Sequence, residues 1–235
     1  MPENAKTKLA GMDGVLTSGN PKFMNSLKQI DELHVPVLLE RTLEILGESL
    51  AGEDAVLVDC TLGLGGHTEA FLEKFPTLTV IGIDRDQNAL KLAGERLARF
   101  GNRARFAHAT YDEILEVLDD LDIPAVQGIL LDLGVSSMQL DERDRGFAYS
   151  YEAPLDMRMN QTTGITAAEI LQTYSESELI RIFREYGEEK LAPRYARAIV
   201  AERAQNPIER SGHLVTVLND ATPYALRNAG HPAKR

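Results

Sequence analysis

Short apolar runs alternate with amphipathic stretches through the first half of the chain. Four runs rich in Val, Ile and Leu have the length of strands buried on both faces: residues 55–59, 78–84, 103–108 and 128–133. Helical patterns separate them at residues 68–75, 87–100 and 111–121. This repeat of strand, helix and strand predicts a parallel sheet with right-handed crossovers, the doubly wound, Rossmann-like α/β class.

The pattern changes after Gly134. Residues 165–230 hold several helical stretches with no convincing strand between them, which predicts a helical subdomain. Apolar positions recur at spacings of three and four in one of these stretches, so we expect them on the core face of a helix: Leu179, Ile182, Phe183 and Tyr186. Thr166 and Glu169 have the spacing of a capping box.

The start of the chain lacks a sustained apolar period, so residues 1–32 are predicted to be a flexible leader. From His34 a helical pattern begins, with Pro36 at its expected first turn. The predicted organisation is therefore a leader at 1–32, the first part of an α/β core at 33–140, and the helical subdomain at 141–235.

Composition places the chain among globular proteins, with 43% apolar and 26% charged residues. Its apolar runs are too short to cross a bilayer, and the N-terminus lacks the basic-then-apolar order of a signal peptide, so we predict a cytoplasmic protein. Cys60 is the single cysteine, which excludes an internal disulfide or a cysteine-rich zinc site. We predict no metal site and expect Cys60 in the core.

The net charge of −11 argues against a protein that coats nucleic acid through bulk positive potential. The charge is uneven, because residues 181–235 hold 10 basic against 6 acidic residues (+4) and residues 1–180 hold 15 against 30 (−15). The basic part can meet RNA, or it can be a set of solvated helix faces; composition leaves both open.

The string VDCTLGLGGH at residues 58–67 is the sharpest local signal. A strand ending in Asp59 runs into a glycine-rich loop before the next helix, which lets backbone approach a ligand at the carboxyl end of the sheet. The dinucleotide fingerprint needs a third glycine where Thr68 stands, so the motif favours S-adenosylmethionine over NAD. Turn chemistry alone remains the alternative.

Three further residues are expected on the same carboxyl edge. Asp84 ends the second strand 19 residues after Gly65, close to the spacing at which an acid reaches ribose hydroxyls. It can instead cap the next helix. Tyr111 follows the third strand and Asp132 closes the fourth, so a ring and a second acid are predicted there, although packing explains many such tyrosines.

Several longer strings resemble the ribosomal RNA small-subunit methyltransferase H family, also called MraW: HVPVLLE (34–40), DCTLGLGGHTEA (59–70), GIDRD (82–86), GILLDLGVSSMQLDERDRGFAYS (128–150), APLDMRMN (153–160), YGEEKLAPRYARAIV (186–200) and HPAKR (231–235). The resemblance spans nearly everything after residue 33. It implies a class I methyltransferase core with an inserted helical subdomain. The implied activity is S-adenosylmethionine-dependent methylation of the N4 amino group of a decoding-centre cytidine in 16S rRNA.

The resemblance also implies the cofactor-binding residues: Gly65, Gly66, His67, Asp84, Tyr111, Asp132 and Gln139. The amine of cytidine is a poor nucleophile until its nitrogen pyramidalises. We hypothesise that Asp132, with backbone carbonyls of the following loop, orients that amine, acting by positioning and electrostatics. Asp132 can alternatively hold the methionine amino group of the cofactor.

The loop DERDRGFAYS supplies arginines beside aromatic residues, a mixture able to contact phosphate and stack on an extruded base. The candidate RNA contacts are Arg143 and Arg145, near Phe147 and Tyr149, with Arg158 further along. Local pairing with Asp141, Glu142 and Asp144 is the equally open alternative.

Three features depart from the family's pattern: Cys60, Asn160 and a chain that stops at HPAKR. Family members continue into further strands of the sheet, so we expect residues 128–133 to form an exposed apolar edge, and this chain to be a C-terminally truncated fragment of low stability and little activity. The expected partner is 16S rRNA, with the acidic net charge favouring the assembled small subunit over free RNA.

Two other classes stay open. One is a catalytically silent RNA- or cofactor-binding module, and the other is an NAD-dependent oxidoreductase, which Thr68 and Asp59 disfavour. A DNA amino-methyltransferase is nearer in chemistry, but the Pro-Pro-aromatic motif expected after Asp132 is missing.

Overall fold

The structure, a computed structural model, describes residues 36–136, 139–140, 142–147 and 151–226. The chain forms two compact units, Met1–Gly134 and Val135–Arg235. The division falls six residues before the boundary predicted at residue 140, at the point where the pattern of apolar runs changes. The predicted leader, residues 1–32, lies outside the described residues.

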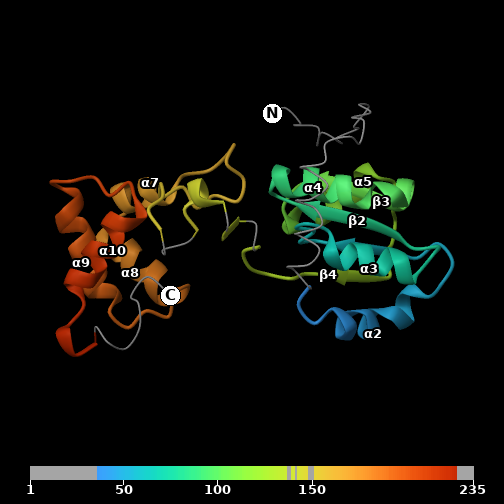
Figure 1. The fold of residues 1–235 in the computed structure, drawn as a ribbon, viewed down its shortest axis with the longest axis horizontal. Helices are drawn as coiled ribbons and strands as arrows, with labels where there is room; N and C mark the ends of the chain where they lie inside the picture. Colours follow the sequence, from blue (N-terminus) through green and yellow to red (C-terminus); the bar gives the residue numbers. More distant parts are fainter. Residues whose placement is uncertain (1–35, 137–138, 141, 148–150, 227–235) are drawn as a thin grey trace. The chain divides into compact units, whose positions relative to one another are not determined.

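The first unit is built on a four-stranded parallel sheet in the order β3-β2-β1-β4 (Figure 1). Its strands are β1 (Val56–Asp59), β2 (Thr79–Asp84), β3 (Ala104–His108) and β4 (Gly128–Leu130). The predicted α/β class with a parallel sheet is confirmed. β4 ends three residues earlier than the apolar run predicts, because within the described residues it lies at the edge of the sheet and its backbone leaves the ladder after Leu130.

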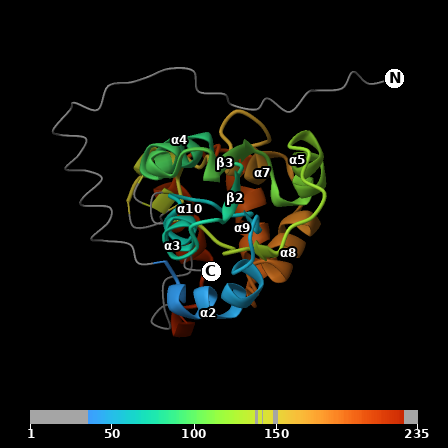
Figure 2. The same cartoon turned by 90° about the vertical axis from the view of Figure 1, so that its right-hand side faces the viewer.

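Helices cover both faces of this sheet. They are α2 (Leu39–Leu50), α3 (Gly66–Lys74), α4 (Gln87–Leu97) and α5 (Ile114–Asp120), with the 3₁₀ helices η1 (Ala98–Arg103) and η2 (Tyr111–Glu113). Figure 2 shows α3 and α4 on one side of the sheet and α5 on the other. Pro36 precedes α2 and is not in its first turn, because Leu38 adopts the left-handed conformation (φ 54°) and the helix begins after it.

Alternate residues of the strands pack into two cores, one on each face of the sheet. Leu57 and Val80 pack with α2, α3 and α4, whereas Val58, Ile81 and Cys60 pack on the side of α5. This is the two-sided burial that continuous apolar runs predict for parallel strands. Cys60 is a buried core residue, as expected.

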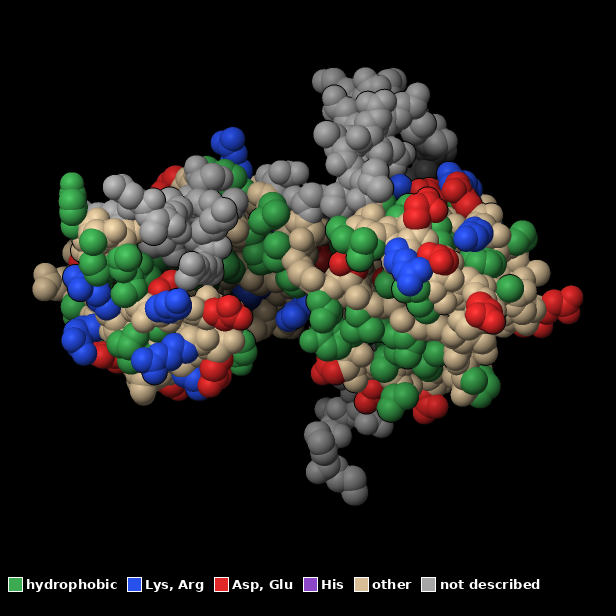
Figure 3. Space-filling model, turned by 90° about the horizontal axis from the view of Figure 1, so that it is seen from below, with side chains coloured by type: hydrophobic (Ala, Val, Ile, Leu, Met, Phe, Trp, Pro, Cys, Tyr) green, Lys and Arg blue, Asp and Glu red, His purple; other side chains and the backbone are tan. Residues whose placement is uncertain are grey.

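The edge of the sheet at β4 is apolar and open within the described part of the chain. Ile129, Leu131 and Leu133 are exposed, and the last of them keeps 68% of its surface. Figure 3 shows apolar side chains gathered on the face of the first unit that carries α2 and β4. The exposed apolar edge that the sequence predicts is therefore present.

The second unit is helical. It contains α7 (Ala167–Thr173), α8 (Glu176–Glu185), α9 (Ala192–Arg203) and α10 (Ser211–Ala221), with the short η3 (Arg143–Arg145) and η4 (Tyr224–Leu226). Its core joins residues of these helices and the segments between them: Leu155, Leu171, Leu179, Tyr195, Ala196, Ile199, Ile208 and Leu218. The only β pairing among its described residues is one bridge between Pro154 and Arg210.

The pattern read from α8 is partly confirmed. Leu179 is fully buried and Ile182 and Phe183 are partly buried, but Tyr186 is 76% exposed. Tyr186 follows the last residue of α8 as its C-cap, so the periodicity no longer fixes its direction. The capping box of Thr166 and Glu169 is confirmed at the start of α7.

A search of the described segments for a membrane-crossing helix, one both long and apolar enough, gives none.

Candidate functional site

The loops that follow β1, β2, β3 and β4 form one edge of the sheet, called here the carboxyl edge. Parallel strands bring their carboxyl ends to the same side, so the strand order sets the order of the groups along it. Tyr111 comes first, then Asp84, then the glycine loop of residues 60–66, then Asp132. The predicted residues of the first unit therefore gather at one edge.

The glycine loop has two residues in the left-handed region, Gly63 (φ 53°) and Gly65 (φ 77°), and Gly65 is the N-cap of α3. A Cβ at Gly65 would lie 2.8 Å from Leu97 Cδ1, and one at Gly66 would lie 2.7 Å from Pro36 Cγ. Both glycines are therefore required by turn geometry and internal packing. Backbone close to a ligand is compatible with this but is not needed to explain them.

His67 is buried in the first turn of α3. Its Nε2 lies 3.0 Å from the carbonyl oxygen of Val37, and Pro36 covers the neighbouring Gly66. These contacts of Val37 and Pro36 hold the segment before α2 against the start of α3. The ring of His67 serves this contact, which leaves its backbone as the part able to meet a cofactor.

Asp59 is the buried centre of the glycine loop, with 2% of its surface exposed. Its Oδ1 accepts from the Thr61 N–H (3.2 Å) and its Oδ2 from the Thr68 hydroxyl (2.7 Å). Burial raises the pKa of the Asp59 carboxyl above its ordinary 3.8, while the two hydrogen bonds lower it. Asp59 therefore holds the glycine loop in shape from the interior and does not serve as a ligand-binding group at the carboxyl edge.

Asp84 joins two neighbouring loops. Its Oδ2 accepts from the Gly63 N–H at 2.8 Å and its Oδ1 from the Asp86 N–H at 2.9 Å. Burial raises the pKa of Asp84, and these backbone bonds lower it. The cap of α4 is Asp86, whose side chain accepts from the Asn88 N–H, so the capping alternative considered for Asp84 does not apply.

The two ends of the carboxyl edge are open. The Tyr111 ring is 53% exposed in η2, and Asp132 is exposed beyond the end of β4. The N–H of Asp132 donates to the Thr61 hydroxyl at 2.7 Å. An exposed ring and an exposed carboxylate therefore lie at the two ends of this edge.

These groups fit the chemistry of an adenosyl cofactor with a sulfonium and an ammonium group. A carboxylate has about four acceptor positions, so Asp84 can accept from hydroxyls while keeping its two backbone bonds. Asp132 and Asp84 both carry the sign that complements a cationic ligand. Tyr111 supplies an exposed ring face for a purine.

Gln139 belongs to the second unit. Its Oε1 accepts from the Ser136 N–H at 3.0 Å, and its own N–H donates to Ser136 Oγ at 3.3 Å. The side chain is buried in this local turn. Its predicted contact with the cofactor stays a prediction.

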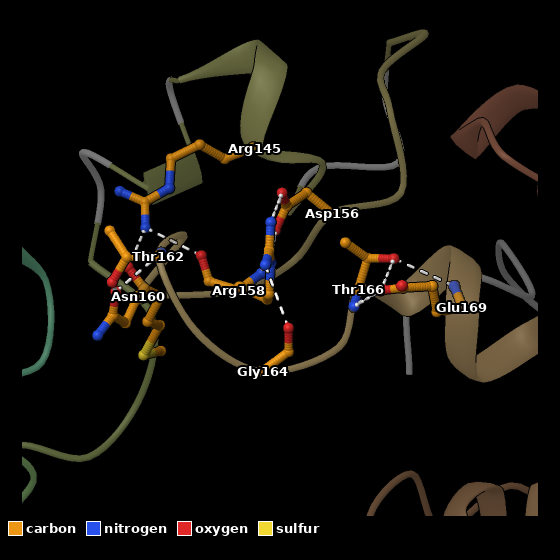
Figure 4. A network of polar contacts seen from close by, with 9 residues as sticks. Arg145, Asp156, Arg158, Asn160, Thr162, Gly164, Thr166 and Glu169 are labelled. Atoms are coloured by element: carbon orange, nitrogen blue, oxygen red, sulfur yellow. Dashed lines mark hydrogen bonds and ion pairs between the residues drawn. The ribbon is translucent and has the colours of Figure 1, made fainter.

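Arg145 and Arg158 both lie in a network of polar contacts within the second unit (Figure 4). Arg145 is 3% exposed, its Nη2 donates to the carbonyls of Arg158 (3.1 Å) and Met159 (2.6 Å), and it pairs with Glu142. Arg158 forms two bonds to Asp156 and one to the Gly164 carbonyl. This geometry favours a structural role for both arginines.

Arg143 is exposed, with its guanidinium 5.1 Å from the centre of the Tyr151 ring. Proteins that bind single-stranded nucleic acid use cations and aromatic rings of this kind at their surface. Phe147 lies against Arg145, and Tyr149 lies outside the described residues.

The second unit also has a partly open pocket of about 320 Å³. Its walls are mostly apolar and come from α7 to α10 and the preceding loop, among them Phe147, Ile170, Phe183 and Leu214. Sequence periodicity does not show this pocket, because the same stripe of apolar residues is typical of a filled core.

The residues that sequence reasoning missed are Thr61 and Thr68. Thr61 lies inside the string VDCTLGLGGH, and Thr68 directly follows it, where the sequence shows it only as a departure from the dinucleotide fingerprint. The bond between Thr61 and Asp132 joins residues far apart in the chain, and the bond between Thr68 and Asp59 joins the start of α3 to the end of β1. The sequence signal that could have identified them is the presence of two threonines shortly after Asp59.

The sequence profile of the MraW methylase family matches residues 31–235. The chain belongs to this family. Two relatives are each named "Ribosomal RNA small subunit methyltransferase H". One, from Clavibacter michiganensis subsp. michiganensis, is 58% identical over 206 residues, which cover 88% of this chain and 65% of the relative. The other, from Streptomyces avermitilis, is 59% identical over 203 residues, covering 86% and 64%. The chain thus spans slightly less than two thirds of the length of these family members.

A solved structure of an rRNA methylase from Streptococcus thermophilus is 24% identical, with a TM-score of 0.34, over 43% of this chain and 57% of that one. The fold assignment rests on the parallel sheet of the first unit and on the family match.

Proposed function

We propose that this protein uses S-adenosylmethionine to methylate the N4 amino group of a cytidine in the decoding centre of 16S rRNA. The observation that supports it best is the order of groups along the carboxyl edge, in a chain of the MraW methylase family: ring, acid, glycine loop, acid. The relatives' name supports the small-subunit rRNA as substrate.

The cofactor residues proposed in the first unit follow that order. Tyr111 stacks on the adenine and Asp84 accepts from the ribose hydroxyls, because an exposed ring and an acid with spare acceptor positions come from adjacent strands. The backbone of Gly65, Gly66 and His67 lies at the start of α3, and Asp132 faces the methionine end or the amine. Gln139 completes the proposed set.

Bound S-adenosylmethionine supplies a methyl group on a cationic sulfur, which is open to attack by a nitrogen lone pair. Asp132 accepts from the N–H of the cytidine amine and favours the pyramidal nitrogen whose lone pair points at the methyl carbon. The amine would take the methyl group from the bound cofactor, and the proton that it gives up would pass to solvent, to which the Asp132 carboxylate is exposed. The residue contributes by positioning and electrostatics, since no covalent intermediate on the protein is required.

We propose Arg143 as an RNA contact of the second unit, because its charge is at the surface beside Tyr151. The internal hydrogen bonds of Arg145 and Arg158 support a role for both residues in holding the loop in shape. Replacing Arg143 with Gln should weaken RNA binding and reduce its salt dependence, whereas Arg158→Gln should act through the stability of the loop.

The test is transfer of labelled methyl groups to small ribosomal subunits from cells that lack the enzyme. It compares this chain with the full-length Clavibacter relative. Label on a decoding-centre cytidine supports the proposal. Cofactor binding without label from either protein would favour a silent binding module, and binding of NAD in place of S-adenosylmethionine would favour an oxidoreductase.

A further inference from the structure

The ladder between β1 and β4 continues one step past the strands through a side chain. The last backbone bond runs from the Cys60 N–H to the Leu130 carbonyl, at 2.9 Å. Beyond it the Asp132 N–H donates to the hydroxyl of Thr61 at 2.7 Å. The Thr61 hydroxyl therefore takes the position in the ladder that a backbone carbonyl would hold.

Thr61 is itself held on a rigid base. Its N–H donates to the buried carboxylate of Asp59, which also accepts from Thr68 in the first turn of α3. The hydrogen-bonded chain therefore runs from the start of α3 through Asp59 and Thr61 to Asp132. It joins the glycine loop to the segment after β4 through bonds whose acceptors are all side-chain oxygens.

Asp132 depends on this hydrogen bond to Thr61, because the residues around it are poorly packed. The neighbouring Leu131 and Leu133 are exposed, and β4 is only three residues long. Among the described residues, the bond to Thr61 is the one hydrogen bond that connects the backbone of residues 131–134 to the sheet. Loss of this bond would release the segment that carries the Asp132 carboxylate.

We propose that Thr61 is a positioning residue for methyl transfer. Its hydroxyl fixes the main chain of Asp132, so that the carboxylate and the glycine loop keep one spacing along the carboxyl edge. This inference rests on the proposed function, in which Asp132 meets the amine. Thr61 acts through Asp132 and needs no contact with substrate.

The experiment compares three variants of the full chain. Thr61→Val keeps the shape and removes the hydroxyl, Thr61→Ser keeps the hydroxyl, and Thr77→Val removes an exposed hydroxyl elsewhere in the first unit. The readouts are hydrogen exchange of the Asp132 amide, the dissociation constant for S-adenosylmethionine and the single-turnover rate on small subunits.

For Thr61→Val we expect exchange at Asp132 to rise on the order of 10-fold and the rate to fall roughly 10- to 100-fold, because small displacements of an orienting group have large effects. Cofactor affinity should change less than about 3-fold, because Asp84 and the glycine loop are untouched. Thr61→Ser should restore exchange and rate, and Thr77→Val should match the parent chain.

Three results would overturn the proposal. Exchange at Asp132 that is unchanged in Thr61→Val would mean that the hydroxyl does not hold this segment. Equal losses of affinity and rate would mean that Thr61 supports only the glycine loop. Failure of Thr61→Ser to restore exchange and rate would mean that a hydroxyl at this position is not sufficient to hold the segment. If neither the parent chain nor the full-length Clavibacter relative transfers a methyl group, the proposed function fails, while exchange at Asp132 still decides the positioning role.

Discussion

Two carboxylates of the first unit and two of the second have opposite surroundings. In the first unit, Asp59 is buried and Asp84 is half-buried, and both accept from backbone N–H groups and hold the loops of one sheet edge together. In the second unit, Glu169 and Glu178 lie at the surface and close capping boxes at the starts of α7 and α8. Asp59 and Asp84 thus shape a candidate ligand site, whereas Glu169 and Glu178 fix the starts of helices.

Helix starts also differ, but not by unit, since α2, α9 and α10 lack a side-chain cap and α4 is capped by Asp86. α3 begins at Gly65 with no side-chain cap, although α7 and α8 begin at Thr166 and Ser175 with complete capping boxes. A helix that leaves its first N–H groups without a local cap keeps them for another acceptor. The uncapped start coincides with the edge proposed to bind the cofactor.

The largest effect is expected from a glycine of the second unit. A Cβ at Gly146 would lie 2.1 Å from the Pro154 carbonyl oxygen, and φ is 76° there. Gly146→Ala should therefore destabilise the unit by about 3 kcal/mol, because backbone must move and the conformation is strained. Gly164→Ala has a similar φ (79°) but open space, so it should cost only about 1 kcal/mol. Equal urea midpoints for the two variants would contradict the packing argument.

Replacing Asp59 tests the buried acid of the first unit. Asn keeps one acceptor but turns an N–H₂ group toward a donor, so Asp59→Asn should lose about 2 kcal/mol of stability and weaken cofactor binding. Asp119→Asn, on an exposed position of α5, should stay within about 0.5 kcal/mol. Denaturant melts and titration with S-adenosylmethionine measure both. An Asp59→Asn variant that is as stable as the parent and binds S-adenosylmethionine normally would show that Asp59 does not support the glycine loop.

A smaller effect is expected at the caps of the second unit. Thr166→Ala removes the acceptor for the Glu169 N–H and should cost about 1 kcal/mol. Thr173→Ala, whose hydroxyl donates to a carbonyl within the same helix, should cost less than half of that. The two melting curves are compared at one pH, and coincidence of the curves would show that the cap adds nothing.

The smallest effect is on pH dependence, and its sign differs between the units. Hydrogen bonds lower the pKa values of Asp156, Glu169, Glu178 and Glu202, so the stability they add is present above the ordinary values and is lost as pH falls through the folded values. Burial raises the pKa values of Asp59 and Asp84, so their contribution is fully present below 3.8 and is lost as pH rises through the folded values. The exposed Asp112 has a lowered pKa and opposes this within the first unit.

Hydrogen exchange resolves the two units. Between about pH 7 and pH 3.5, the opening free energy should fall at the amide of Leu179 and should not fall at that of Ile83, both residues being fully buried. Parallel loss at both amides would mean that the buried acids do not set the pH response of the first unit.

The sequence predicted the sheet and the helices well, because long periodic patterns and the glycine motif are local signals. It also placed Tyr111, Asp84 and Asp132 at one edge, since strand ends in a parallel sheet share a side. It predicted β4 too long and put Pro36 inside α2, because edge position and the left-handed Leu38 are set by tertiary contacts. The burial of Arg145 and the bond between Thr61 and Asp132 depend on residues distant in the chain.

The most direct test of the central claim is an amide-resolved titration of this chain with S-adenosylmethionine, with NAD as the comparison ligand. We expect S-adenosylmethionine to cause saturable shifts at the amides of Gly65, Gly66, Asp84, Tyr111 and Asp132, and NAD to cause none. Asp84→Asn should weaken the affinity for S-adenosylmethionine at least about 10-fold, because charge-assisted hydrogen bonds are lost. Shifts confined to other residues, or equal responses to both ligands, would contradict the carboxyl edge as an adenosyl cofactor site.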